Sequence, residues 1–184
     1  SSYRSRSQYR ASSGYVSKVK RADERGIEVG VSIPLIYSAS SFMSTHMAAY
    51  AMSDALQGEL AKFGWYGEGS WEFTMFPEER FNFRMACAPA ARSGMPASLF
   101  PEDSVETVVS GLRSTLRRLS AGITSEDVAI YRSSLLKTME STMPTPDMMM
   151  QMVALRYSFG KDIATRYQDK INGISDGEVN DILS

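Results

Sequence analysis

The sequence is poor in the side chains that most often build catalytic and metal centres. Its 184 residues hold one histidine, His46, and one cysteine, Cys87. A single cysteine excludes a disulfide within the chain. A catalytic zinc site needs three protein ligands, which two donors about 40 residues apart do not supply. We therefore expect no metal, no cofactor and no catalytic residue in this chain, and we expect Cys87, in an apolar strand pattern, to be a buried inert thiol.

Long apolar runs and a large net charge are also absent. No stretch approaches the roughly 18–20 apolar residues of a membrane span, so we predict none. The net charge of −1 gives no general attraction to nucleic acid, and no nucleic-acid partner is expected. The charge is uneven, because the first 25 residues hold seven basic side chains against Asp23 and Glu24. That segment carries +5, and the remainder carries −6.

Motifs for phosphate binding and nucleophilic catalysis are missing as well. Gly67-Glu68-Gly69 precedes a strand pattern rather than a helix, and no serine lies in a G-x-S-x-G turn. Two clusters leave alternatives open. The methionines 148–150 and 152 suit either an adaptable helix core or a soft-metal or peptide-binding surface. An aromatic group suits either a ligand platform or the core of a sheet: Trp65, Tyr66, Trp71 and Phe73.

The chain divides into an arm and a domain. Residues 1–14 are rich in Ser, Arg and Tyr without an apolar period, which predicts a basic flexible arm or linker. Residues 15–184, in a chain that is 43% apolar and 22% charged, predict a single domain with a proper core. Because the chain begins with serines rather than methionine, we expect a piece of a longer protein.

A long helix organises the predicted domain. From Ser40 an apolar stripe at three- to four-residue spacing runs to Phe63, serines before it offer N-cap hydroxyls, and Gly64 is placed to end it. Before this helix, residues 15–19 and 27–36 predict a strand hairpin. The second strand alternates apolar side chains at Ile27, Val29, Val31, Ile33 and Leu35. Pro34 lacks an amide donor, so we expect it at an edge of the sheet or near a strand end.

After the long helix, residues 67–75 and 80–87 alternate as two strands. Pro77-Glu78-Glu79 between them predicts antiparallel pairing. Further helices are expected at 101–122, from Thr124 to Pro144, from Thr145 to Gly160, through Ile163, Tyr167 and Ile171, and after Ser175, with a surface excursion at 88–100. Strands and helices do not alternate strictly. The predicted fold class is therefore α+β, an antiparallel or mixed sheet with helices packed mainly on one face.

The order of elements resembles the pitrilysin/insulinase-type zinc metallopeptidases. The similar segments, over about residues 27 to 184, are the strand Val29–Leu35, the long helix with Leu56-Gln-Gly-Glu-Leu60, the turn Phe63-Gly64-Trp65-Tyr66, the helix start Gly122-Ile-Thr-Ser-Glu-Asp-Val128, and the end Ile171–Val179. The resemblance implies a roughly 200-residue α+β unit that repeats in the family and encloses a chamber.

The family's zinc motif H-x-x-E-H is absent from this sequence, so the resemblance implies a non-catalytic domain that is inactive alone. Its partners would be a zinc-bearing catalytic domain and a peptide substrate. In the family's non-catalytic half, a tyrosine helped by an arginine holds the substrate backbone. Tyr66 matches that tyrosine, and no arginine stands at 57–61.

Two other classes stay open beside the chamber domain. One is a structural or assembly subunit with the peptidase fold and no proteolysis, and the other is a stand-alone peptide-binding domain. For a chamber wall cut from its neighbour, we expect an exposed apolar face and possible self-association of the isolated domain.

Overall fold

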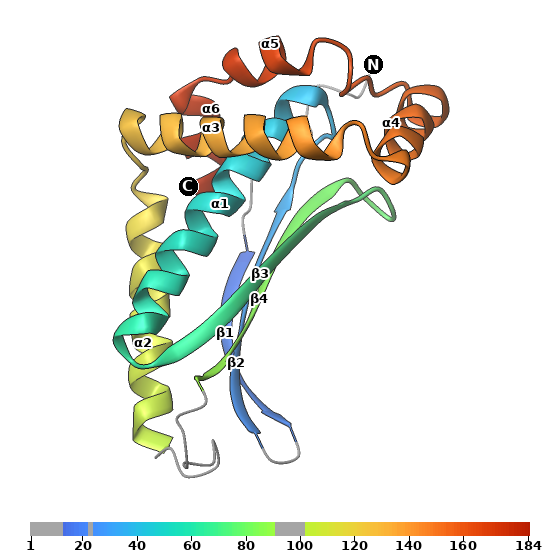
Figure 1. Cartoon of the computed structure of the whole chain (residues 1–184). Helices are drawn as coiled ribbons and strands as arrows, with labels where there is room; N and C mark the ends of the chain where they lie inside the picture. Colours follow the sequence, from blue (N-terminus) through green and yellow to red (C-terminus); the bar gives the residue numbers. More distant parts are fainter. Residues whose placement is uncertain (1–12, 22–23, 91–101) are drawn as a thin grey trace, which may run out of the picture.

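The computed structural model describes residues 13–21, 24–90 and 102–184 (Figure 1). The elements in chain order are β1 Ser13–Arg21, β2 Glu24–Pro34, α1 Ala39–Lys62, β3 Trp65–Thr74, β4 Arg80–Pro89, α2 Glu102–Ser120, α3 Ser125–Thr142, α4 Pro146–Phe159, α5 Tyr167–Asn172 and α6 Asp176–Leu183. This is an α+β fold, as predicted. Among the described helices, none combines the length and apolarity needed to cross a membrane.

The sheet has four strands in the order β1-β2-β4-β3, and every pair is antiparallel. The two predicted hairpins are present, and they join through their inner strands β2 and β4. Ile27 pairs with Cys87, and Phe83 lies between Val31 on β2 and Trp71 on β3. The mixed-sheet alternative is thereby excluded. Pro34 closes β2, a central strand, which fits the strand-end position rather than the edge.

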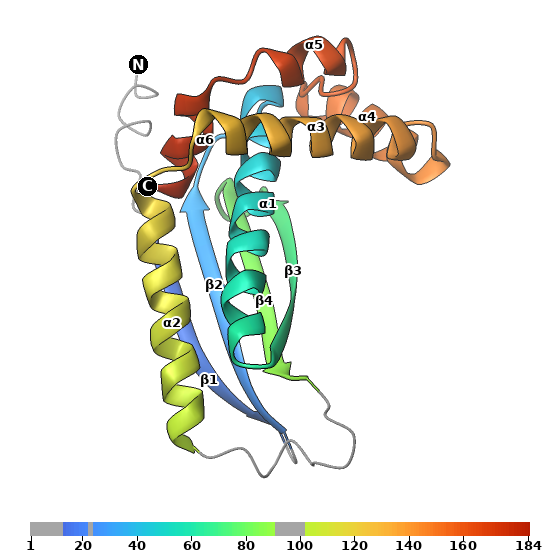
Figure 2. The ribbon, with the colours of Figure 1, turned by 60° about the vertical axis from the view of Figure 1, so that its left-hand side comes forward.

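The helices gather on one side of the sheet (Figures 1 and 2). α1 runs along the sheet over β3, with α2 beside it, while α3, α5 and α6 lie across one end of α1. The strand side chains beneath the helices are almost wholly buried: Ile27, Val29, Ile33, Phe81, Phe83, Met85 and Cys87. This covered face and α1 form the centre of the core.

α1 begins and ends as its sequence indicates. Ser38 is its N-cap, and the Ser38 hydroxyl accepts from the Ser41 amide while the Ser41 hydroxyl accepts from the Ser38 amide. Gly64, just beyond Phe63 at the C-terminal cap, has a φ of 70°, which a glycine adopts without steric cost. Twelve of the helix's residues are buried, so α1 is packed on several sides.

Two glycines let α1 lie close to β3. A methyl group on Gly67 would lie 2.7 Å from Leu60 Cδ1 and 2.8 Å from Met85 Sδ. A methyl group on Gly69 would lie 3.1 Å from Ser53 Oγ. Gly67 and Gly69 therefore serve helix–sheet packing, which is one common reason for glycine within a strand.

The C-terminal helices are set by caps. Thr124 caps α3, Thr145 caps α4, and Ser175 forms a reciprocal capping box with Glu178 at α6. Gly160 ends α4 at a φ of 66°. The side chain of Asn180 on α6 accepts from the Ile123 amide and donates to the Ile123 carbonyl, which fixes the start of α3.

Some predicted bounds were wrong. The helix predicted through Ile163, Tyr167 and Ile171 is limited to α5, which begins at Tyr167, and Ile163 is a buried residue before it. Residues 13 and 14, predicted as part of the arm, belong to β1, and residues 1–12 lie outside the described part of the chain. Ala88 and Pro89 continue β4, and residues 91–101 of the predicted excursion also lie outside it.

Candidate functional site: the uncovered face of the sheet

No described helix lies on the second face of the sheet (Figures 1 and 2). Side chains alternate between the faces of a strand, and the register aligns the alternate positions of β2, β4 and β3 into rows. Four of these positions hold Gly30, Pro34, Ala86 and Ala88, and the other ten are polar or tyrosine. We call these ten residues the uncovered face: Glu28, Ser32, Tyr66, Glu68, Ser70, Glu72, Thr74, Arg80, Asn82 and Arg84.

A chain of side-chain hydrogen bonds crosses this face from β3 to β2. Asn82 Nδ2 donates to Thr74 Oγ1 at 3.3 Å, and Ser32 Oγ donates to Asn82 Oδ1 at 2.7 Å. Arg80 Nε in turn donates to Ser32 Oγ at 2.8 Å. Because Asn82 is bonded through both amide atoms, its orientation is fixed, and one end of the uncovered face is a rigid polar surface.

The charges of the uncovered face are only partly paired. Arg84 Nη2 lies 3.0 Å from Glu28 Oε1, and Arg80 pairs with Glu78 at the turn before β4. Glu68 and Glu72 are exposed on β3, and no ion pair within the described part of the chain engages them. Among the described residues, the β3 side of the face therefore carries negative charge without an ion-pair partner.

Tyr66 projects from the uncovered face. Its side chain is 60% exposed, whereas the neighbouring Trp65 is 4% exposed on the covered face. Trp71 and Phe73 share the face of Trp65 because they are an even number of residues from it. The ligand platform of four aromatic side chains is therefore wrong: strand alternation sends Tyr66 to the other side.

The resemblance implies an arginine at residues 57–61 of α1, and none is present. This segment instead makes a hydrogen bond to the backbone of β3. Gln57 Nε2 donates to the carbonyl of Gly67 at 3.2 Å, next to Tyr66. Across the sheet, Tyr66 pairs with Ala88 on β4, a small neighbour. The backbone next to Tyr66 is thus held by a hydrogen bond, while the Tyr66 side chain is exposed beside a small neighbour. Its substrate-binding role stays a prediction.

His46 and Cys87 lie within the helix-covered side, away from the uncovered face. His46 Nδ1–H donates to the Phe42 carbonyl at 2.7 Å, and its ring lies 4.3 Å from the Phe42 ring and 6.1 Å from Trp71. Burial lowers the pKa of His46, against an opposing effect of that hydrogen bond. Burial raises the pKa of Cys87 to about 12, which fits the predicted inert thiol. No group of three His, Cys, Asp or Glu residues suited to a metal ion occurs among the described residues.

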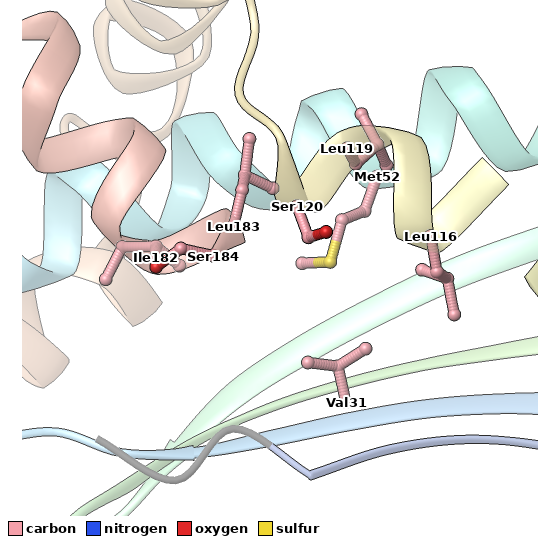
Figure 3. Close-up of a pocket in the computed structure, with 8 residues that line it drawn as sticks. All are labelled: Val31, Met52, Leu116, Leu119, Ser120, Ile182, Leu183 and Ser184. Carbon is pink, nitrogen blue, oxygen red and sulfur yellow. The ribbon is translucent and has the colours of Figure 1, made fainter. Parts of the chain in front are cut away.

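A small apolar cavity lies between the sheet, α1, α2 and α6 (Figure 3). Its volume is about 140 Å³, and its lining is mostly aliphatic, with Val31 below and Met52 and Leu116 on the helices. Ligand sites usually reach roughly 300–1,000 Å³. This cavity is therefore a packing gap rather than a binding site.

The hydrogen-bonded row of the uncovered face was not predicted from the sequence. The signal was present in the polar alternation of Arg80, Asn82 and Arg84 along β4. That pattern identifies a solvated strand face, but which side chains bond to one another depends on register with β2 and β3.

Comparisons with known proteins support a likeness of fold alone. No protein-family model matches the chain, and no curated protein matches it. Eight chains of solved structures match. Among them is the ferredoxin protease FusC, as a mutant in complex with Arabidopsis ferredoxin, at 14% identity and a TM-score of 0.65.

The match covers 90% of this chain and 18% of the FusC chain, so the chain spans less than a fifth of that protease's length. At this identity the likeness is one of fold alone. The chain therefore has a distant fold relationship to one part of a protease.

Proposed function

We propose that this chain is a non-catalytic domain of a zinc-dependent peptidase, and that its uncovered sheet face forms part of a substrate chamber's wall. The observation that carries the proposal is the bare, polar and locally rigid face with Tyr66 exposed on it. The fold likeness to part of a protease supports the same role, as does the absence of H-x-x-E-H from the sequence.

The chemistry of β3 suits an extended peptide. Tyr66, Glu68, Ser70 and Glu72 stand at alternate residues of one strand, about 7 Å apart along it. An extended peptide presents its own side chains at the same spacing. Exposed Glu68 and Glu72 favour basic side chains, and the Tyr66 ring offers an apolar surface with a hydroxyl.

The test is peptide binding by the purified chain. Fluorescence anisotropy with a labelled, unstructured peptide rich in Lys and Arg measures affinity for wild type, Tyr66→Ala and Glu68→Lys/Glu72→Lys. Both variants are expected to bind more weakly, and Ile130→Ala, on α3, is the matched control that keeps wild-type affinity. Tyr66→Phe separates the two parts of the side chain, because it removes the hydroxyl and keeps the ring.

Activity gives the second readout. The chain alone is expected to cleave no peptide with zinc present, and in the full-length protein Tyr66→Phe is expected to weaken peptide turnover without changing this domain's melting temperature. A peptide affinity that is unchanged in both β3 variants contradicts the chamber-wall role. A chain that binds no peptide at all is the result expected of an assembly subunit with the same fold.

A further inference from the structure

Helix α4 carries apolar side chains on two sides, and the domain covers one of them. Met152 is buried, while Met148 and Leu155 are half-buried and pack against the core. These three residues recur at spacings of four and three, so they lie on one side of the helix. That inner side accounts for the attachment of α4 to the domain.

The other side of α4 is apolar and exposed. We call its four side chains the outer stripe: Met149 is 56% exposed, Met150 73%, Val153 54% and Tyr157 80%. At about 100° per residue these four side chains share one side of the helix, and their mean direction points away from that of the inner side. The remaining side of α4 is polar, with Asp147, Gln151 and Ser158, so the helix carries two separate apolar stripes and the domain covers one of them. Figures 1 and 2 show α4 at the far end of α3, away from the body of the sheet.

We propose that the outer stripe binds the same stripe of a second copy of this chain, as an antiparallel helix pair about a two-fold axis at Val153. This inference goes beyond the chamber-wall role and does not depend on it. Pairing would cover these four side chains, which are 54–80% exposed. Four side chains from each copy supply an area near the roughly 1,000 Å² in total that marks the lower end of specific interfaces, so the dimer is expected to be weak.

The order of residues along α4 is self-complementary in that arrangement. A two-fold axis at Val153 sets Met149 of one copy opposite Tyr157 of the other, and methionine sulfur packs favourably on aromatic rings. Antiparallel pairing also sets the N-terminal end of each helix dipole beside the C-terminal end of its partner, whereas parallel pairing joins like ends.

Light scattering after size-exclusion chromatography, over a wide range of concentration, tests the proposal. Wild type is expected to shift from monomer to dimer as its concentration rises. Val153→Glu sets two carboxylates together at the axis and is expected to stay monomeric. The matched control is Ile130→Glu, because Ile130 is 59% exposed on α3 outside the stripe, and it is expected to dimerise as wild type does. Far-UV circular dichroism checks that both variants keep their helix content.

Cross-linking tests the register. Val153→Cys faces itself across the axis and is expected to form a disulfide-linked dimer under mild oxidation, whereas Ile130→Cys is not. Cys87 is buried and does not compete. A wild type that stays monomeric overturns the proposal, as does a dimer that survives Val153→Glu. Peptide binding at the uncovered face is measured separately, so failure of the dimer leaves the chamber-wall proposal standing and the reverse also holds.

Discussion

The two faces of the sheet are made by the same strands and are stabilised in different ways. On the covered face, Phe81, Phe83 and Met85 have no exposed surface, and they pack beneath α1. On the uncovered face, Ser32 and Asn82 are held by hydrogen bonds between side chains. Burial on one face supplies most of the stability, since apolar area removed from water is the dominant favourable term. The other face is left free to present chemistry.

The largest expected effect is on the covered face. Phe83→Ala removes a fully buried ring at the centre of the sheet and is expected to cost about 3–5 kcal/mol of unfolding free energy. Asn82→Ala, one residue away on the other face, is expected to cost only about 1 kcal/mol. Urea denaturation of both variants measures the difference. Equal losses would break the contrast between the faces.

The second prediction concerns the close approach of α1 to β3. Gly67→Ala forces a methyl group against buried Leu60 and Met85 and is expected to cost about 1–3 kcal/mol. Gly58→Ala on α1 meets nothing within 4 Å, so there the same change is expected to stabilise by up to about 1 kcal/mol. Thermal melts of the two variants should move in opposite directions, and a shared direction is the result that contradicts close packing at Gly67.

The third prediction is a pH dependence that arises on the covered side. Because burial lowers the pKa of His46, the unfolded chain binds a proton more readily than the folded chain. Stability is therefore complete above the unfolded pKa of about 6.5 and falls as the pH drops below it.

His46→Gln removes this titration, so its unfolding free energy should vary less than that of wild type between about pH 7 and 5. Urea denaturation at several pH values measures it. The pKa of Glu178 is lowered chiefly by its hydrogen bond from the Ser175 amide. The stability that ionised Glu178 contributes is therefore lost at a lower pH, and it is lost equally in wild type and in His46→Gln. If the unfolding free energies of wild type and His46→Gln vary identically down to pH 5, the pH dependence does not come from His46.

The smallest effect is expected at the charges of the uncovered face. Glu72→Gln removes an exposed carboxylate without a described ion pair and should change the unfolding free energy by less than about 0.5 kcal/mol. The same denaturation assay measures it, and salt should leave the difference unchanged or reduce it. A loss above 1 kcal/mol would mean that Glu72 has a structural role.

Local signals in the sequence predicted most of the fold. Ser38 and Gly64 bound α1, Thr124 and Thr145 mark helix starts, and alternating side chains located three of the four strands, β2, β3 and β4. These features are local, and one short segment specifies each of them. The antiparallel alternative proved correct, although local patterns left the order β1-β2-β4-β3 undetermined.

Features that depend on strand register or on residues distant in the chain were not predicted from the sequence. Tyr66 was grouped with Trp65 because the two are adjacent, whereas adjacency in a strand places them on opposite faces. The bonds of Asn82 to Thr74 and Ser32 need three strands in register. The methionine run is divided between core and surface, with Met152 buried and Met150 exposed, because the two sides of α4 have different neighbours. Its alternative as a soft-metal or peptide-binding surface stays a prediction.

The joining of the two hairpins through β2 and β4 has a consequence for the order of folding. Each hairpin closes locally, but Ile27 meets Cys87 and Pro34 meets Arg80 only after the chain has passed through the whole of α1. Such long-range pairing costs loop-closure entropy before any contact compensates it, and it slows folding. On the ribosome, β2 emerges with an open edge and keeps it until β4 follows. A strand edge that waits in this way is a template for the wrong partner, so the interval between the two hairpins is the stage at which this domain is most exposed to aggregation.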